Sequence, residues 1–231
     1  MALSKIDLDK AGVTGTLPTS NLDTVGVAQG GTGITSGTTD QFLKFTGTTT
    51  LASSADNGNY VYLNKATSTS TASDITFDNF SATYPIYKIF CWWHNGTSNT
   101  TARFRLRNSS GDITSSIYRA AVSRVLLTSS EGNINGSASE YDVAQFRLGN
   151  GGSTFDDHRQ AAEITVFRPS EPDSCMVHFK NSFWSSDNNE FVRWEGAGWC
   201  NTQEAHTGIK FYQSSGTIND YYYVIYGLKD S

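Results

Sequence analysis

Charged side chains are scarce in this sequence: Asp, Glu, Lys and Arg together make up 17% of its 231 residues, against about a quarter in typical globular domains. The helix formers Leu, Glu and Lys are also few, whereas Ser, Thr, Asn and Gly are abundant. This composition favours strands and turns over helices. The net charge of −5 argues against nucleic acid as a partner, because phosphate recognition requires clustered Lys and Arg.

Long apolar runs are absent as well. No stretch approaches the ~20 consecutive apolar residues that a membrane-spanning helix requires. The residues after Met1 lead into Asp7 and Asp9 rather than into the apolar core of a signal peptide. We therefore expect a protein that is made in the cytoplasm without secretion and that does not insert into a membrane.

Cysteine is also rare, with three residues in the chain. Cys91, Cys175 and Cys200 are widely spaced and form no Cys-x-x-Cys pair, so neither a zinc site nor a disulfide framework is indicated. Each is expected to be a buried free thiol that packs as a small apolar side chain. No metal and no cofactor are expected.

Aromatic residues divide the chain into two parts. Before Tyr60 the only aromatic residues are Phe42 and Phe45, whereas 27 of the 29 lie from Tyr60 onward. We place the boundary there, with an extended Gly- and Thr-rich arm at residues 1–58 and a head domain at residues 59–231. The overall 37% of hydrophobic residues is enough for one sizeable core in the head.

The arm allows two interpretations. Segments rich in Gly, Ser and Thr are often flexible linkers. The alternative is an extended segment that is ordered by two sister chains or by a larger assembly on which it docks. We prefer the second, because apolar residues recur at short intervals from Ile6 to Phe45 and give such an assembly something to bury.

The head sequence is typical of an antiparallel β-sandwich. Runs of about 5 to 10 β-branched and aromatic residues alternate with Gly, Asn, Ser and Asp turns. Strands are expected at residues 60–64, 75–80, 86–94, 102–108, 113–127, 141–148, 161–168, 175–184, 190–199, 208–213 and 221–228. About eight to eleven strands fit a jelly roll, with hairpin turns at 108–112 and 214–216.

One expected strand carries a row of arginines. Arg103, Arg105 and Arg107 alternate with apolar residues. Because successive side chains of a strand point to opposite faces, the arginines are expected on a solvated or interface face and the apolar residues in the core.

Short phrases in both parts resemble phage tail-fibre and related virion surface proteins. In the arm, residues 17–22 read LPTSNL and residues 25–33 read VGVAQGGTG. The arm residues that carry the resemblance are Leu17, Pro18, Leu22, Val25, Val27, Gly30, Gly31 and Gly33. In the head, residues 73–80 (SDITFDNF) resemble the opening of jelly-roll heads at the ends of phage fibres, and residues 223–230 (YVIYGLKD) resemble the end of their last hairpin.

The resemblance implies a homotrimeric structural protein on the virion surface. Its arm would attach to another tail, baseplate or capsid protein, and its head would bind a host cell-surface glycan or outer-membrane component. The expected function is therefore that of a tail fibre in host attachment. A capsid decoration or head-fibre protein is the alternative, and a polysaccharide depolymerase is a third possibility.

Enzyme motifs are incomplete. Residues 31–37 miss the spacing of a dinucleotide-binding loop, and residues 151–155 lack the final Gly of a nucleophile elbow. A glycosidase needs two carboxylates across a cleft, and spacing alone does not pair Glu163, Glu190 or Glu195. We expect no catalytic activity.

Binding is better supported than catalysis, because sugar recognition combines aromatic rings with amide and carboxylate groups. The longest polar connections are 128–140, 149–160 and 184–190, and at least one of them is expected to form the exposed tip, since rigid scaffolds present recognition loops. The receptor-binding candidates are Trp184, Asp187, Asn188, Asn189, Asp156, Asp157 and His158. For the last three, a solvated turn is the simpler interpretation.

The remaining tryptophans are divided between core and surface by position. Trp92 and Trp93 are adjacent in an expected strand, so one is expected in the core and the other at an interface. Trp194 and Trp199 are further ligand candidates, but they lie on opposite faces of one expected strand, and one of these faces must be core.

Overall fold

The structure is a computed structural model that describes residues 42–45, 51–54, 60–96, 100–127, 132–152, 159–185 and 190–229. The chain divides into two compact units, Met1–Ala55 and Asp56–Ser231. In the first unit, β1 (Phe42–Phe45) pairs antiparallel with β2 (Leu51–Ser54). The arm residues that carry the family resemblance, from Leu17 to Gly33, lie outside the described residues.

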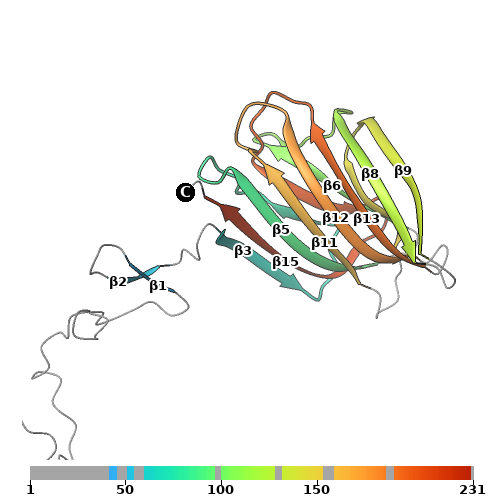
Figure 1. The fold of residues 1–231 in the computed structure, drawn as a ribbon, viewed down its shortest axis with the longest axis horizontal. Coiled ribbons are helices and arrows are strands. Elements are labelled where there is room, and N and C mark those ends of the chain that lie inside the picture. Colours follow the sequence, from blue (N-terminus) through green and yellow to red (C-terminus); the bar gives the residue numbers. More distant parts are fainter. Residues whose placement is uncertain are drawn as a thin grey trace, which may run out of the picture. The chain divides into compact units, whose positions relative to one another are not determined.

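The second unit is an antiparallel sandwich of two sheets, which confirms the predicted all-β class (Figure 1). The large sheet has the order β3 (Tyr60–Ser68), β15 (Ile218–Leu228), β5 (Ile86–Asn95), β11 (Gln160–Phe167), β12 (Cys175–Ser185), β13 (Glu190–Cys200), β8 (Tyr118–Leu127), β9 (Gly132–Val143). The small sheet has the order β10 (Phe146–Gly152), β6 (Thr100–Asn108), β14 (Gly208–Gln213), β4 (Asp74–Phe77), with β7 (Gly111–Asp112) paired to β6.

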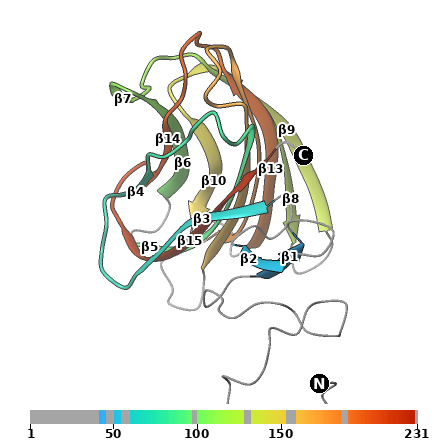
Figure 2. The same ribbon diagram turned by 90° about the vertical axis from the view of Figure 1, so that its left-hand side faces the viewer.

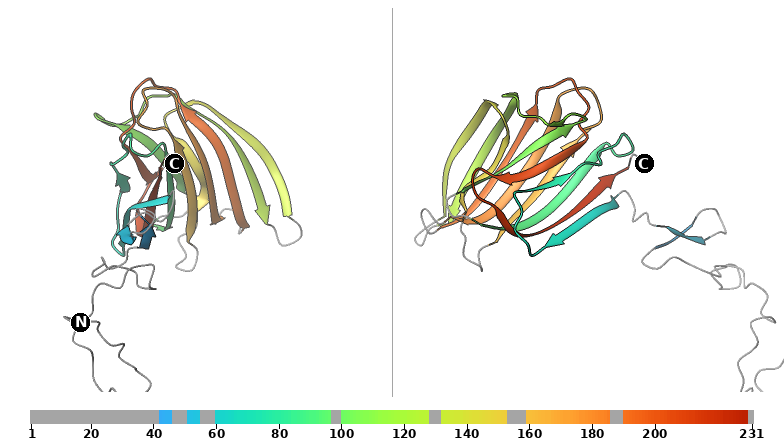
Figure 3. Two further views of the ribbon diagram at one scale, coloured as in Figure 1. Left: turned by 60° about the vertical axis from the view of Figure 1, so that its left-hand side comes forward. Right: turned by 180° about the vertical axis from the view of Figure 1, so that it is seen from behind.

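The two sheets are joined by one paired position, Gly152 with Ser185, and otherwise face each other as layers. Figure 2 shows this arrangement, with β4, β6 and β14 in one layer and β8, β9 and β13 in the other, and Figure 3 gives two further views. The described residues include no helix that is long and apolar enough to cross a membrane.

Alternation along the strands sets the core. In β6, Ala102, Phe104 and Leu106 are buried, so the three arginines between them face outward, as predicted. In β12 the same alternation buries every second residue from Cys175 to Ser185. Because both sheets bury one face each, the core is a single layer of side chains between them.

Aromatic rings fill the centre of this layer. Phe104 of β6 contacts Phe146 of β10, Phe179 of β12 and Phe211 of β14, with centroid distances of 4.8, 5.7 and 6.2 Å. Tyr118 of β8 packs edge-on against Phe146 at 4.9 Å. The rings therefore connect strands of both sheets, and such pairs stabilise beyond the area that they bury.

Close approach of this layer to the large sheet requires glycine at Gly198 of β13. A Cβ atom there would lie 2.3 Å from the carbonyl oxygen of Arg119 and 2.8 Å from the Phe146 ring. The nearest obstacle is backbone of the neighbouring strand β8, which cannot rotate away. Gly198 thus permits both the strand pairing and the ring packing.

The predicted strand boundaries were wrong around β8 and β9. Residues 113–127 do not form one strand: β7 ends at Asp112, and β8 begins only at Tyr118 after two bends at Ser115 and Ser116. The predicted loop 128–140 contains most of β9, which pairs with β8 along its length. The predicted strand 141–148 contains the end of β9 and the start of β10, separated by a bend at residues 144–145.

The number of strands was also underestimated: the described residues of the second unit form thirteen, against about eight to eleven predicted. The predicted hairpin turn at 108–112 is present between β6 and β7, with Gly111 at a φ of 117°. The predicted hairpin at 214–216 was wrong: the chain bends there, with Gly216 at a φ of 74°, but β14 and β15 lie in different sheets and do not pair. Positive φ values of this kind favour glycine, which lacks the Cβ atom that would clash.

The three cysteines are buried free thiols, as predicted. Burial raises the pKa of the Cys91 thiol to about 12, and the pKa of Cys200 is likewise raised to about 12, chiefly by burial. The reactive thiolate form is therefore absent at neutral pH. The cysteines pack as core residues.

His206 is the buried group from which we predict a pH effect. It follows β13, is 1% exposed, and neither ring nitrogen has a hydrogen-bond partner among the described residues. Burial lowers its pKa from the ordinary value of 6.5, against a smaller opposing effect of Glu204. The folded protein therefore disfavours the protonated ring.

The free energy of unfolding is expected to fall as pH drops below about 6.5, because the unfolded chain then binds a proton that the folded chain resists. For one such group the slope is at most about 1.4 kcal/mol per pH unit. His206→Leu is expected to reduce this acid dependence, measured by urea unfolding between pH 7.5 and 5. Equal slopes for the variant and the wild type would refute a depressed pKa.

Candidate functional site

The two ends of the sandwich differ in what they carry. β3, β5, β8, β10, β12 and β14 all finish at one end, here named the loop end, where β6, β9, β11, β13 and β15 begin. The pairs Trp93–Gln160, Leu127–Phe191 and Gly152–Ser185 fix this alignment. Connections that are far apart in the sequence therefore leave the sandwich together.

The chain enters the head at the opposite end. Tyr60, at the start of β3, pairs with Leu228, which in turn pairs with Ile86 at the start of β5. Figure 1 shows the start of β3 and the end of β15 close together. The loop end is thus the end of the head opposite Tyr60, the first described residue of the head.

Most of the predicted receptor-binding residues lie outside the described residues, namely Asp156, Asp157, His158, Asp187, Asn188 and Asn189. The strands on either side of them are described, and both connections start and finish at the loop end. Trp184 is described: it is half-buried in β12, between buried Phe183 and Ser185, and faces away from the small sheet.

A buried amide cluster lies beneath the loop end. The Asn95 side-chain oxygen accepts hydrogen bonds from Gln160 and Gln213, each at 2.8 Å, and from the Trp93 indole at 3.2 Å. The Asn181 amide donates to the Leu148 carbonyl at 2.8 Å and to Gln160 at 3.1 Å. These hydrogen bonds connect five strands, β5, β10, β11, β12 and β14, at the base of the connections.

A groove crosses the outer face of the large sheet, the face away from the small sheet. It consists of two open hollows of about 410 and 390 Å³ that share Glu163 and Lys180. One hollow is lined further by Phe90, Trp92, Ala161, Ser182 and Tyr222, and the other by Thr165, His178, Glu195 and Ala197. We name this surface the outer groove.

Aromatic residues form one end of the outer groove. The Trp92 and Tyr222 rings are neighbours across β5 and β15, 6.3 Å apart and nearly parallel at 18°. The Arg159 guanidinium lies over the Trp92 ring, 4.9 Å from its centroid. The rings are half-buried, so they are held in place and still line the groove.

Charged residues form a row across the middle of the outer groove. Glu163, Lys180 and Glu195 are direct neighbours on β11, β12 and β13. Glu163 pairs with Lys88 at 2.8 Å, and Glu195 pairs with Arg193 at 3.2 Å. Each carboxylate thus already has a cationic partner, Lys88 on β5 for Glu163 and Arg193 on the same strand for Glu195.

Lys180 differs from these residues. It is exposed, and among the described residues no carboxylate oxygen lies within 4.0 Å of its ammonium nitrogen. It stands between two carboxylates that are engaged elsewhere. The centre of the groove therefore carries a cation that the described part of the chain does not neutralise.

The two groove carboxylates, Glu163 and Glu195, lie on strands two steps apart, about 10 Å at the backbone, with Lys180 between them. Both are also committed to ion pairs. In addition, the described residues contain no group of His, Cys, Asp and Glu side chains that would hold a metal ion.

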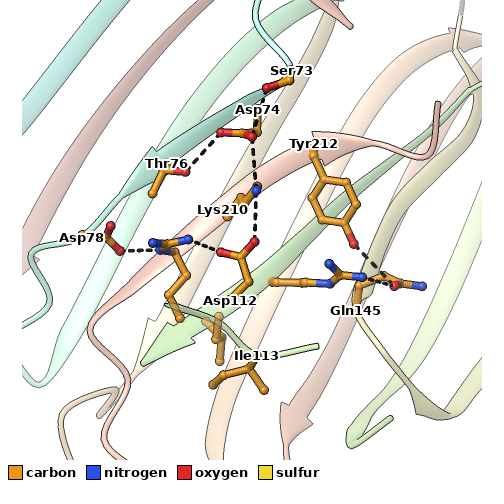
Figure 4. Close-up of polar contacts among 12 residues, drawn as sticks. Ser73, Asp74, Thr76, Asp78, Asp112, Ile113, Gln145, Lys210 and Tyr212 are labelled. Atoms are coloured by element: carbon orange, nitrogen blue, oxygen red, sulfur yellow. Dashed lines mark hydrogen bonds and ion pairs between the residues drawn. The ribbon is translucent and has the colours of Figure 1, made fainter. Parts of the chain in front are cut away.

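One member of the arginine row Arg103, Arg105 and Arg107 takes part in a salt-bridge network on the small sheet (Figure 4). Arg107 pairs with Asp78 at 2.6 Å and also with Asp112, and Lys210 pairs with Asp112 at 3.0 Å and with Asp74 at 3.2 Å. Arg105 instead donates hydrogen bonds to the Ala144 carbonyl and the Gln145 side chain. The network ties β4, β6, β7 and β14 together.

The other tryptophans behave as alternation predicts. Trp93 and Trp194 are buried in the core, and the Trp194 indole donates a hydrogen bond to the Arg147 carbonyl at 3.2 Å. Trp199 is 39% exposed on the opposite face of β13. Of the adjacent pair, Trp93 is core and Trp92 lies at the surface, in the outer groove.

Comparisons with known proteins found no match. No protein-family model, no curated protein and no solved structure is similar to this chain at the level required for a match.

The amide cluster yields a stability prediction. Asn95→Ala removes the acceptor of three buried donors and is expected to cost about 2 to 5 kcal/mol, because each unpaired buried donor costs about 1 to 3 kcal/mol. Urea unfolding measures the change. The control is Asn201→Ala: Asn201 is exposed and accepts a hydrogen bond from Ser174, and its loss is expected to cost less than about 0.5 kcal/mol. Equal losses of unfolding free energy in the two variants would contradict a stabilising role of the Asn95 hydrogen bonds.

Proposed function

We propose that this protein is a structural component of a phage virion, a tail fibre whose head attaches the particle to a glycan on the host surface. The arm, residues 1–58 in the sequence-based division, attaches to another virion protein. The head presents its loop end and outer groove to the host. The sequence phrases LPTSNL, VGVAQGGTG and YVIYGLKD support membership of this class of proteins.

The observation that carries the proposal is the polarity of the head. The chain enters at one end, at Tyr60, and six strands finish at the other, namely β3, β5, β8, β10, β12 and β14. A protein anchored through an N-terminal segment must present its binding surface away from the anchor. The loop end lies opposite Tyr60 and is therefore suited to present a binding surface. Rigid scaffolds in general carry their recognition residues on loops.

The outer groove supports a glycan as the ligand. Sugars are bound by aromatic rings for their apolar faces and by amide, hydroxyl and carboxylate groups for their hydroxyls. The groove offers the rings of Trp92 and Tyr222 beside Ser182 and Glu163. The groove is open to the surface, so a long polymer can lie along it and extend beyond its ends.

We further propose that the protein is a homotrimer with a contact along β3. This strand is one of the two edges of the large sheet, the other being β9, and among the described residues it pairs only with β15. Its Tyr60 and Tyr62, 46% and 50% exposed, pack edge-on against Tyr226. A free edge with exposed aromatic rings favours unwanted pairing unless a sister chain covers it.

Antibody against residues 60–231, applied to intact phage particles and imaged by electron microscopy, tests the function. Label at the tail or baseplate is expected for an attachment fibre. Label spread over the capsid would identify a decoration or head-fibre protein instead, and no label would remove the virion assignment. Particles assembled without this protein are the control. Purified protein is also expected to block host attachment without releasing reducing ends from host polysaccharide.

Native mass spectrometry at low micromolar concentration tests the trimer, with an expected mass three times that of the 25.2 kDa chain. The double variant Tyr60→Ser, Tyr62→Ser is expected to shift the population toward monomer. Tyr141→Ser, which alters a tyrosine that is 67% exposed on β9, is the control and leaves the trimer intact. A monomeric wild type would overturn the trimer, and a trimeric double variant would overturn the role of β3.

A further inference from the structure

We propose that the outer groove binds an acidic glycan, with a sugar ring beside Trp92 and Tyr222 and the acid group, a carboxylate or a sulfate, on Lys180. This inference rests on the proposed function and names the ligand class of the same site. Two independent features carry it, the aromatic end of the groove and the unneutralised cation at its centre.

The size of the groove suits an oligosaccharide. Its lining residues come from β15, β5, β11, β12 and β13, five neighbouring strands. Adjacent strands are about 4.8 Å apart, so the groove spans about 19 Å. The aromatic residues lie on the first two strands and Lys180 on the fourth. A chain of several sugars is therefore needed to contact both.

Charge decides between an acidic and a neutral ligand. Glu163 and Glu195 are neutralised by Lys88 and Arg193, which leaves the Lys180 ammonium as the unbalanced charge at the centre. Arg159, 51% exposed over Trp92, makes a 3.6 Å contact to Asp220 within the described part of the chain. Two cations thus flank the aromatic hollow, and hydrogen bonds from a cation to an anionic group are about twice as strong as neutral ones.

The same charge argues against a second copy of this chain as the occupant. A protein surface pressed on the groove would bury Lys180, and burying an unpaired charge is costly. The core of a protein interface is accordingly depleted in lysine. A flexible polyanion instead supplies the counter-charge and leaves the groove partly hydrated.

The test uses the full-length protein on an array of bacterial surface glycans, in which each acidic glycan is printed beside its methyl-esterified or desulfated form. Binding to acidic members and loss of binding to their neutralised forms are expected. Lys180→Gln is expected to weaken binding about tenfold or more, the effect of losing one charge-assisted hydrogen bond. Lys180→Arg keeps the charge and is expected to retain binding.

Matched variants separate the groove from general charge and from folding. Arg168→Gln removes the same charge at a site 70% exposed that follows β11, at the end opposite the loop end, and is expected to bind normally. Trp92→Ala tests the aromatic end. Because Trp92 is half-buried, its effect counts only if the unfolding midpoint stays near that of the wild type; Lys180 is exposed, so Lys180→Gln remains decisive if Trp92→Ala unfolds.

Failure of this inference is distinguishable from failure of the proposed function. If the wild type blocks phage attachment while Lys180→Gln binds every glycan and blocks attachment equally well, the inference is wrong and the function stands. If the wild type binds neutral glycans alone, the inference is likewise wrong and the proposed function stands. If the wild type binds no glycan and does not block attachment, both proposals fall.

Discussion

The packing of Phe104 is the contact on which the rest of the head depends. The two sheets share one paired position, Gly152 with Ser185, so side chains rather than backbone hold the layers together. Phe104 contacts rings from both sheets. Filling this space fixes the register of every strand that borders it, because a slip of one residue turns each side chain to the other face. The outer groove is therefore placed by the same packing that forms the core.

Sequence patterns predicted the strands that obey alternation and failed where the pattern is weak. β6, β12 and β13 were predicted within a few residues, because buried and exposed positions alternate clearly in them. β9 was taken for a loop, since Gly132–Val143 is rich in Gly, Ser and Asn and offers little apolar signal. Its structure comes from backbone pairing with β8, a long-range interaction that composition does not reveal.

The candidate site could also be predicted from the sequence only in part. The sequence indicated that one of Trp92 and Trp93 lies at a surface, and Glu163 was a candidate carboxylate. No local pattern connects them to Lys180 and Tyr222, because the groove residues come from separate strands and become neighbours only through the strand order. The loop end has the same origin: the connections were predicted, but only the pairing of the strands brings them to one end of the sandwich.

The alternation within β12 has an evolutionary consequence. Lys180 points outward between Phe179 and Asn181, which are both buried. A mutation at Lys180 alters the outer face without disturbing the core, and the same holds for Ala161 and His178 on exposed positions of the same face. The chemistry of the outer face and the folding of the core are thus encoded by different positions of the same strands. Single substitutions can therefore change the outer face while the fold stays the same.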